Sequence, residues 1–260
     1  ESDIIEYLSK DKNTRVICLY VEGVKDGKKF IDVMKKVTEK KPVIVIKGGI
    51  TEEGNKAALS HTGSLAGSSE VYFGIFKQVG LIKADTLGQM LDYASIFENS
   101  IKPKGNRVFV ITNGGGYGIL STDAISLDKN LEMAKLDKKT VLALKKNLHK
   151  MVNVTNPLDL LGDANTSSYT IALENCINDD NVDVILLIVL YQTPLISTDV
   201  VDIIIEYNDL KKKPIVVVSA GGEFTEVLSK DLDENGIATY TFPDEAVKSI
   251  SALVEYYVKK

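Results

Sequence analysis

Short apolar runs alternate with longer amphipathic stretches along almost the whole chain. The runs have the length and β-branched content of buried strands, whereas the stretches repeat their apolar positions with a helical period. This alternation is typical of βα units that feed a parallel sheet, so the sequence predicts an α/β fold. We expect strands at Val16–Tyr20, Val43–Lys47, Leu81–Lys83, Val108–Thr112, Val184–Leu190, Ile215–Ser219 and Thr239–Thr241. We expect helices at Gly27–Thr38, Ser69–Val79, Thr86–Ser100, Gly118–Asp128, Lys138–Leu148, Thr170–Asn178, Ser197–Leu210, Thr225–Glu234 and Asp244–Lys259.

A segment that combines Pro, Gly and charge, Lys102–Asn106, lies between two such series of elements. This composition interrupts regular structure and indicates a linker. With 260 residues, of which 44% are hydrophobic, the chain is long enough for two ordinary domains. We therefore expect a first domain over residues 1–102 and a second over residues 103–260.

The two series repeat one another. Arg15–Tyr20 leads through a helix to Lys41–Gly49, and Asp183–Ile188 leads likewise to Lys213–Gly222. Each half then reaches a short strand and a closing amphipathic helix. Self-similarity in a fixed order predicts one architecture for both halves.

Aligning the halves exposes two differences. After Gly49 the first half is longer by roughly a dozen residues, and a longer connection of this kind is often functional. The second half opens with the strand Val108–Thr112, a glycine turn and a helix, which have no counterpart in the first half. Because the chain also starts at Glu1 without Met, we expect it to begin partway through its first domain.

Composition argues against several classes of protein: nucleic-acid-binding, membrane-spanning, secreted and metal-binding. The formal net charge of -5 and the interleaving of Lys with Asp and Glu argue against a sequence-independent grip on nucleic acid. No apolar run is long enough to span a bilayer and no signal-peptide pattern follows Glu1, so we expect a cytoplasmic protein. Cys18 and Cys176 have neither CxxC spacing nor a clustered histidine, which predicts buried free thiols and no metal site.

The longer connection of the first half contains His61, one of two histidines in the chain. Its small neighbours, among them Ser60, Gly63 and Ser64, leave an imidazole unshielded and can surround an anion with donors. A histidine that acts as a nucleophile or carries phosphate needs such surroundings. We take His61 as a candidate catalytic residue and Gly63 as a candidate phosphate-binding residue; a polar loop without chemistry is the alternative.

A second signal is the glycine-rich turn Asn113–Gly118, which follows a strand and opens a helix. Its backbone N–H groups and the positive helix end would face the carboxyl edge of the sheet and could bind an anion. The spacing fits neither the dinucleotide fingerprint nor a P-loop. Gly114, Gly115 and Gly116 are therefore candidate phosphate-binding residues, with close packing as the alternative.

A histidine that accepts phosphate needs one ring nitrogen free and the other oriented by an acceptor. Glu22 directly follows the first predicted strand. In a parallel sheet this places Glu22 at the carboxyl edge, beside the strand that leads to the His61 segment. We expect Glu22 to be the second catalytic residue, with a solvated carboxylate at a strand end as the alternative.

Five blocks of the sequence resemble the alpha subunits of ADP-forming acetyl-CoA synthetases, in the NDP-forming acyl-CoA synthetase superfamily that includes succinyl-CoA synthetase. The blocks are Val21–Val24, Lys47–Gly49, Ser60–Gly67, Asn113–Gly116 and Asn156–Ala164. They follow the family's order and cover nearly the whole chain. The resemblance implies two flavodoxin-like, succinyl-CoA synthetase-like domains with parallel sheets. Residues 1–102 would be the phosphohistidine domain, truncated at its start, and residues 103–260 the ligase-CoA domain.

The resemblance also implies a reversible reaction, in which acyl-CoA, ADP and phosphate give a carboxylic acid, CoA and ATP through an acyl phosphate and a phosphohistidine. His61 would carry the phosphoryl group, Glu22 would orient it, and Gly114–Gly116 would hold phosphate at a helix N-terminus. An imidazole is a competent nucleophile near neutral pH, and helix-end amides stabilise a phosphoryl group without a full counter-charge. Because nucleotide and acyl-CoA bind to different domains in this family, the histidine segment must move.

The family's CoA-binding Rossmann domain and nucleotide-binding ATP-grasp domains have no counterpart in these residues. The resemblance therefore implies Mg-ADP or Mg-ATP bound mainly by an ATP-grasp beta subunit, CoA bound mainly by an N-terminal domain, and an alpha2beta2 heterotetramer. The carboxylic acid and the choice between ADP and GDP stay open.

Two other classes of function stay open at this point. A synthetase-like regulatory module of an acyl-CoA-dependent protein acetyltransferase would keep the fold but often lose the histidine, so the presence of His61 and Glu22 counts against it. A subunit-interaction scaffold would keep the fold with a degenerate site.

Overall fold

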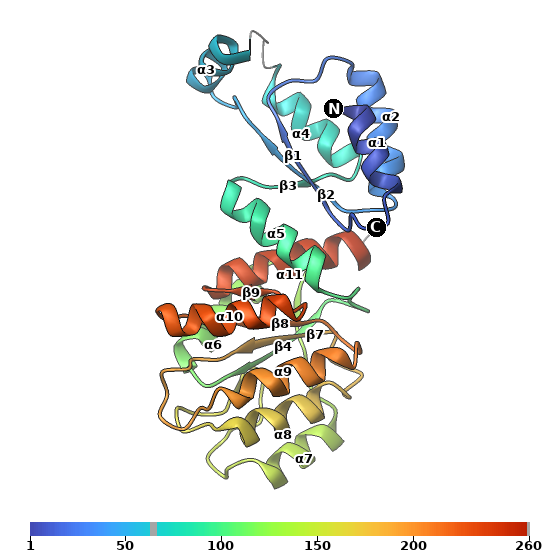
Figure 1. The fold of residues 1–260 in the computed structure, drawn as a ribbon. Coiled ribbons are helices and arrows are strands. Elements are labelled where there is room, and N and C mark those ends of the chain that lie inside the picture. The colour runs from blue at the N-terminus through green and yellow to red at the C-terminus, as the bar shows by residue number, and fades with distance from the viewer. Residues whose placement is uncertain (63–66, 259–260) are drawn as a thin grey trace. The chain divides into compact units, whose positions relative to one another are not determined.

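The computed structural model describes residues 1–62 and 67–258, and it divides into two compact units, Glu1–Glu98 and Asn99–Lys260 (Figure 1). The first unit contains α1 (Ser2–Lys10), β1 (Ile17–Val21), α2 (Gly27–Thr38), β2 (Val43–Lys47), α3 (Glu52–Thr62), α4 (Ser69–Gln78), β3 (Ile82–Lys83) and α5 (Leu87–Asn99). The second contains β4 (Arg107–Thr112), α6 (Gly115–Leu127), β5 (Glu132–Met133), α7 (Lys138–Asn147), β6 (Leu158–Asp159), α8 (Thr166–Cys176), β7 (Val184–Ile188), α9 (Asp199–Asp209), β8 (Ile215–Val218), α10 (Glu223–Glu234), β9 (Thr239–Tyr240) and α11 (Pro243–Val258). Both sheets are parallel throughout, which confirms the predicted α/β fold.

The sheet of the first unit has the order β1-β2-β3. β1 and β2 pair over their full lengths, from Ile17 opposite Val43 to Val21 opposite Lys47. Because side chains alternate along a strand, Ile17, Val21, Val43 and Val45 share one face, and α1, α2 and α4 bury apolar side chains in the same cluster. The carboxyl ends of these two strands carry the residues singled out for chemistry.

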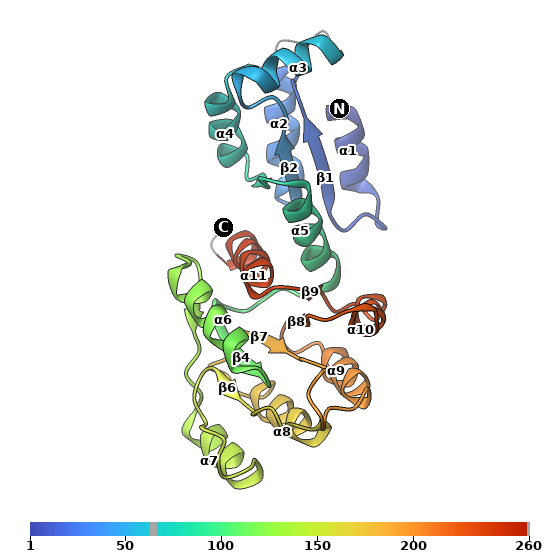
Figure 2. The same ribbon diagram turned by 90° about the vertical axis from the view of Figure 1, so that its left-hand side faces the viewer.

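The sheet of the second unit has the order β5-β4-β7-β8-β9, with β6 also beside β4. This is the strand order 2-1-3-4-5 of flavodoxin-like folds. Helices α7 to α10 contribute to the buried cluster on the face that carries Phe109, Leu187 and Val217, whereas α6 packs against α11 (Figure 2). Every residue of β7 is buried, because strands flank it on both edges and helices cover both faces.

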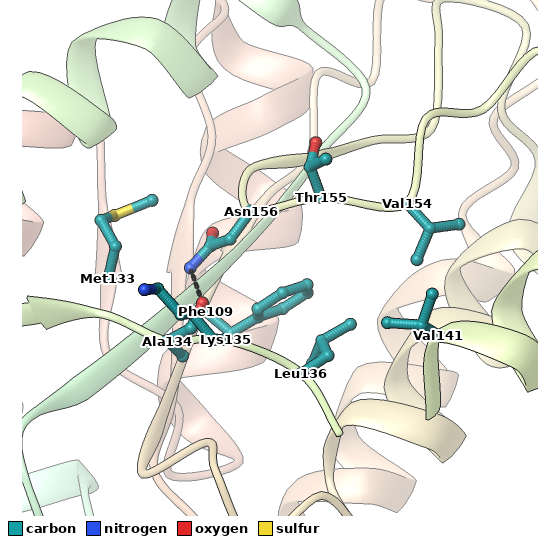
Figure 3. Close-up of a pocket in the computed structure, with 9 residues that line it drawn as sticks. All are labelled: Phe109, Met133, Ala134, Lys135, Leu136, Val141, Val154, Thr155 and Asn156. Atoms are coloured by element: carbon teal, nitrogen blue, oxygen red, sulfur yellow. Dashed lines mark hydrogen bonds between the residues drawn. The ribbon is translucent and has the colours of Figure 1, made fainter. Parts of the chain in front are cut away.

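One side chain closes the gap between β5 and β6, which share the outer edge of β4. Asn156 Nδ2 donates hydrogen bonds to the carbonyl oxygens of Val108 (2.8 Å) and Ala134 (3.0 Å), and its Oδ1 accepts one from Val110 N (2.9 Å). Figure 3 shows this amide at the wall of a pocket of about 330 Å³. The pocket is lined by Phe109, Met133, Ala134, Lys135, Leu136, Val141, Val154, Thr155 and Asn156. None of these lining residues belongs to the glycine turn of the same unit.

The internal repeat is confirmed at the level of single hydrogen bonds. Ile17 N donates to Pro42 O in the first unit and Ile185 N donates to Pro214 O in the second, both at 3.0 Å. β1-β2-β3 therefore correspond in register to β7-β8-β9. The longer connection of the first half contains an additional helix, α3, between β2 and α4.

The lysine of each Lys-Pro pair has the same structural role. Lys41 Nζ donates to the carbonyl oxygens of Leu8 (2.8 Å) and Asp11, and Lys213 Nζ donates to those of Cys176 (3.2 Å) and Asp179. In both units one of these carbonyl groups, of Leu8 or Cys176, belongs to the last turn of the helix that precedes the strand, where a cation is favourable, and the other follows that helix.

Several details differ from the sequence-based expectations. Helices α1 and α3 and the short strands β5 and β6 were not predicted, and α6 begins at Gly115 instead of Gly118 because the glycine turn itself is helical. Cys176 is buried as predicted, but the prediction for Cys18 is wrong. Cys18 is exposed because it lies on the face of β1 opposite Ile17 and Val21. No helix in the described part of the chain has the length and apolarity needed to cross a bilayer.

Candidate functional site

Glu22 lies at the carboxyl edge of the first sheet, one residue beyond β1, and is half-buried. Its Oε1 accepts a hydrogen bond from the Tyr20 hydroxyl at 3.1 Å, and this bond raises the pKa of Tyr20. A Cβ on Gly48 would lie 2.4 Å from the Tyr20 hydroxyl oxygen, so a larger residue at that position would displace the phenol from the end of β2. The carboxylate is thus hydrogen-bonded to a neighbouring phenol at a strand end.

Lys47 is the last residue of β2 and opposes Val21, so it lies at the same edge as Glu22. The residue is buried, with 6% of its surface exposed. Its ammonium donates to Gly48 O and lies 4.8 Å from the centre of the Tyr72 ring, and no carboxylate of the described residues is within 4.0 Å of it. Burial lowers the pKa of Lys47, and the negative charge of Glu22 opposes that shift.

His61 lies near the end of α3 and its side chain is exposed. Figure 1 shows α3 standing apart from the helices that cover the first sheet. Ala58 is the one buried residue between Glu52 and His61, and α3 packs extensively against no other described element. A helix this short without a packed face is marginally stable in water. His61 is therefore carried by an element that can leave its position at low cost.

The described residues show no contact between the two predicted catalytic side chains, His61 and Glu22. Among residues 1–62 and 67–258, the side chain of His61 makes no hydrogen bond or ion pair, and that of Glu22 accepts a hydrogen bond from Tyr20. Both lie in the first unit, whereas Gly114, Gly115 and Gly116 lie in the second. Gly63, the remaining predicted phosphate-binding residue, lies outside the described residues.

The N-terminus of α6 has no side-chain cap, and the carboxylate of Asp159, from β6, lies near Gly115. Gly114 is the N-cap and supplies no side chain, and the first turn holds no acidic residue. By contrast, Asp26, Asn165 and Asp137 cap α2, α8 and α7 with side-chain hydrogen bonds, and α10 carries glutamates in its first turn. Backbone N–H groups at an uncapped helix start, together with the helix dipole, form an anion-binding site.

The glycines of this turn are needed for different reasons. A Cβ on Gly114 would lie 2.4 Å from Leu190 Cδ1, and one on Gly115 would lie 3.0 Å from Asp159 Oδ2. A Cβ on Gly116 would meet no described atom within 4 Å. Packing therefore accounts for the first two glycines, while Gly116 leaves room that no described side chain uses.

Asn113 fixes this turn to the neighbouring strand. Its Oδ1 accepts from Leu190 N (2.8 Å), and its Nδ2 donates to Leu190 O and to Thr193 Oγ1 (both 3.0 Å). β4 and β7 are the strands between which the connections change direction in a flavodoxin-like sheet, and ligands of such folds bind in the crevice at that point. The uncapped start of α6 therefore faces the place where an open α/β sheet binds its ligand.

Sequence reasoning assigned no role to Tyr20, Lys47 or Tyr72. The repeat contained a signal for one of them, because Lys47 occupies the register position of Ser219. A charge where the other half has a small buried hydroxyl indicates a requirement beyond folding. In the described part of the chain, no three His, Cys, Asp or Glu side chains gather in a way that could hold a metal ion.

Comparison with solved structures and sequences places the chain among known proteins. The structure of a Ca. Korarchaeum cryptofilum dinucleotide forming acetyl-coenzyme A synthetase 1 in complex with phosphate and ADP matches with a TM-score of 0.90 and 33% identity, over 98% of this chain and 56% of that one. The alpha subunit of ADP-forming acetate–CoA ligase I from Pyrococcus furiosus is 40% identical over 98% of this chain and 55% of its own length. An ADP-forming 4-hydroxybutyrate–CoA ligase from Nitrosopumilus maritimus is 30% identical over 98% of this chain and 37% of its own length.

The chain spans about half, or less, of the length of these relatives. The resemblance to alpha subunits of ADP-forming acetyl-CoA synthetases is confirmed. Residues 1–97 match the model of the succinyl-CoA ligase like flavodoxin domain, and residues 108–257 match that of the Ligase-CoA domain. The chain therefore belongs to the Ligase-CoA domain family, with a succinyl-CoA ligase-like flavodoxin domain ahead of the Ligase-CoA domain.

Proposed function

We propose that this chain is part of an ADP-forming acyl-CoA synthetase, which converts acyl-CoA, ADP and phosphate into a carboxylic acid, CoA and ATP. The observation that carries the proposal is the 40% identity to an ADP-forming acetate–CoA ligase alpha subunit over 98% of the chain. Relatives named for acetate and for 4-hydroxybutyrate share this region, so the acid is selected elsewhere or by small differences. A regulatory module of an acetyltransferase finds no support among these relatives.

The reaction divides into three displacements. A phosphate oxygen attacks the acyl carbonyl and CoA leaves as the thiolate, which gives an acyl phosphate. The unprotonated ring nitrogen of His61 then attacks phosphorus and the carboxylate leaves with the electrons of the O–P bond. Finally an oxygen of the ADP β-phosphate attacks the same phosphorus, the N–P bond breaks and ATP forms.

We assign Glu22 to the second displacement. Its half-buried carboxylate would accept a hydrogen bond from the other ring nitrogen of His61, which becomes more acidic as phosphate transfers. The open start of α6, at Gly114–Gly116, would bind the phosphate or the transferring phosphoryl group. The weak packing of α3 supports a histidine that travels between separate sites.

The remaining components would lie outside these residues. Mg-ADP or Mg-ATP would be bound mainly by an ATP-grasp beta subunit and CoA mainly by a separate CoA-binding domain, in an assembly of two alpha and two beta chains. The relative named as an alpha subunit supports a beta partner. We further infer domains over residues 1–102 and 103–260, and action in the cytoplasm, where CoA and ATP are available.

Phosphopeptide mass spectrometry under neutral to basic conditions tests this proposal. The assembled enzyme, with its ATP-grasp partner and Mg-ATP, is compared with the His61→Ala and His149→Ala variants. We expect phosphate on His61 in the wild type and in the His149→Ala enzyme, and none in the His61→Ala enzyme. Phosphate absent from His61 while the partner still binds and hydrolyses nucleotide would overturn the proposal.

A further inference from the structure

Tyr72 joins three separate pieces of the carboxyl edge of the first sheet. It lies in the first turn of α4, the first described element after α3. Its hydroxyl oxygen accepts a hydrogen bond from Val24 N (3.0 Å), in the segment that follows β1 and Glu22. Its ring faces the ammonium of Lys47 at the end of β2, at 4.8 Å. Gly67 packs on the same ring, since a Cβ there would lie 3.3 Å from a Tyr72 ring carbon.

The energetics of Lys47 indicate that this contact is strong. A buried ammonium with one carbonyl acceptor and no carboxylate within 4.0 Å needs another source of stabilisation. The face of an aromatic ring provides it, and such a contact is worth most where water is excluded. The corresponding residue of the second unit, Ser219, donates its hydroxyl to Val189 O at 2.7 Å, so the fold alone does not require a cation there.

A neighbouring pair offers a matched comparison. Lys83 of β3 lies 4.6 Å from the ring of Phe73, the residue after Tyr72. Lys83 also pairs with the carboxylate of Asp85, and its side chain is 41% exposed. The two cation–ring contacts therefore share a helix and a sheet, but only the Lys47 contact is buried and lies beside Glu22.

We propose that Lys47 and Tyr72 are positioning residues that clamp the start of α4 to the Glu22 edge, so that the chain returning from His61 is anchored while α3 moves. This inference rests on the proposed function of His61. Tyr72 contacts two points of the edge, Val24 and Lys47, whereas α3 has no comparable attachment to another element of residues 1–62 and 67–258. Anchoring one end of the segment raises the effective concentration of His61 near Glu22.

The test uses the assembled enzyme with the variants Lys47→Met, Tyr72→Leu, Tyr72→Phe and, as the matched control, Lys83→Met. Amide hydrogen exchange is measured over residues 69–72 and 73–78, and kcat and the KM for ADP are measured in the ATP-forming direction. We expect Lys47→Met and Tyr72→Leu to speed exchange at residues 69–72 by about tenfold and to lower kcat by about tenfold, because a desolvated cation–ring contact is lost. The KM for ADP stays within about twofold, since ADP binds elsewhere. Lys83→Met retains most of kcat, whereas Tyr72→Phe, which keeps the ring but loses the hydrogen bond from Val24 N, gives a loss between those of Lys83→Met and Tyr72→Leu.

The outcomes separate this inference from the function beneath it. Equal exchange in the Lys47→Met and Lys83→Met enzymes would show that the clamp does not exist. Faster exchange with unchanged kcat would show a structural contact without a positioning role. If His61 of the wild type is not phosphorylated, the proposed function fails and the positioning role falls with it, whatever the exchange result.

Discussion

The two units place corresponding strands in the same register but bury charge at opposite ends of them. At the carboxyl edge, the first unit has Glu22 and the buried Lys47, where the second has Leu190 and Ser219. The amino edge shows the reverse. Asp183 is buried there in the second unit and bonded to Arg107.

The partners of these charges explain the difference. The Asp183 carboxylate accepts three hydrogen bonds from Arg107: from Nε (2.7 Å), from the NH2 nitrogen (3.0 Å) and from the backbone N (3.0 Å). Its negative charge is therefore compensated within the fold. Lys47 has no such set of partners. The charge of Asp183 is neutralised by a salt bridge that holds two strands together, whereas that of Lys47 meets a carbonyl group and the face of a ring beside Glu22. A perturbed charge of the second kind is a candidate for a functional role.

The largest loss of stability is expected when the ion pair between Arg107 and Asp183 is broken. Asp183→Asn should lower the free energy of unfolding by about 3 kcal/mol, since it leaves a partly buried guanidinium without its carboxylate. At the register position of Asp183 the first unit has Arg15, whose 3.8 Å contact with Glu98 is exposed, so Arg15→Gln should cost less than about 1 kcal/mol. Urea denaturation at pH 7 measures both, and equal losses would contradict the comparison.

The pH dependence of the Asp183 contribution provides a second check. Burial alone would raise the pKa of Asp183, but the hydrogen bonds and charge of Arg107 outweigh it, and the pKa lies below its usual value. A carboxyl group with a lowered pKa stabilises the fold above its unfolded-state pKa and loses this contribution as the pH falls through the folded-state pKa. The stability gap between wild type and Asp183→Asn should therefore be full at pH 7 and shrink below about pH 4.

A substitution at the carboxyl edge of the first sheet should change activity and leave stability nearly unchanged. Glu22→Gln should slow phosphorylation of His61 by about a hundredfold, because a neutral amide no longer orients and charge-stabilises the imidazole. Its melting temperature should stay close to that of the wild type. Rapid-quench measurement of phosphohistidine compares it with Glu39→Gln, an exposed residue after α2 that should have no effect. Normal rates in Glu22→Gln would remove Glu22 from the mechanism.

A feature common to both units should give equal effects in both. Lys41→Met and Lys213→Met each remove an ammonium that bonds two carbonyl oxygens at a helix end. Each variant should lower the free energy of unfolding by about 2 kcal/mol, the range for hydrogen bonds with a charged partner. Thermal unfolding of the two variants tests this. If the two losses of unfolding free energy differ greatly, the repeat preserves the geometry of this contact but not its contribution to stability.

The smallest effect is expected at the open helix start. Gly116→Ala should raise the free energy of unfolding by up to about 1 kcal/mol, because alanine favours the helix and meets no described atom. The same methyl group should raise the KM for phosphate. Gly222→Ala, at the start of α10, also has open space and should leave that KM unchanged. An unaltered KM in Gly116→Ala would argue against phosphate binding at α6.

The sequence predicted the fold well because the long buried strands carry a strong apolar signal. Val43–Lys47 and Gly27–Thr38 match the observed bounds, and the other long elements shift by a few residues. The two-residue strands β5 and β6 were not predicted, because they are strands through pairing with β4 and not through local composition. Helix α1 was not predicted because it is short and mostly polar, and Ile5 is its only buried apolar residue.

The site was only partly visible in the sequence. His61, Glu22 and the glycine turn were found from residue type and position, and their roles remain predictions. The contacts of Tyr72 could not be predicted, because they join Val24, Lys47 and Gly67 across segments that only tertiary packing brings together. A lysine at the end of an apolar strand gives no sign, by itself, of which ring will cover it.

The amide of Asn156 has a consequence for how the second sheet assembles. Its three hydrogen bonds reach Val108 O and Val110 N on β4 and Ala134 O after β5, so they form in one alignment of these segments. A slip by one residue would turn every side chain of β4 to the wrong face and would also forfeit this amide's bonds. Asn156 thus favours a single register of these segments. Aspartate has the same shape but lacks the N–H donors, so it could not make the bonds to Val108 O and Ala134 O.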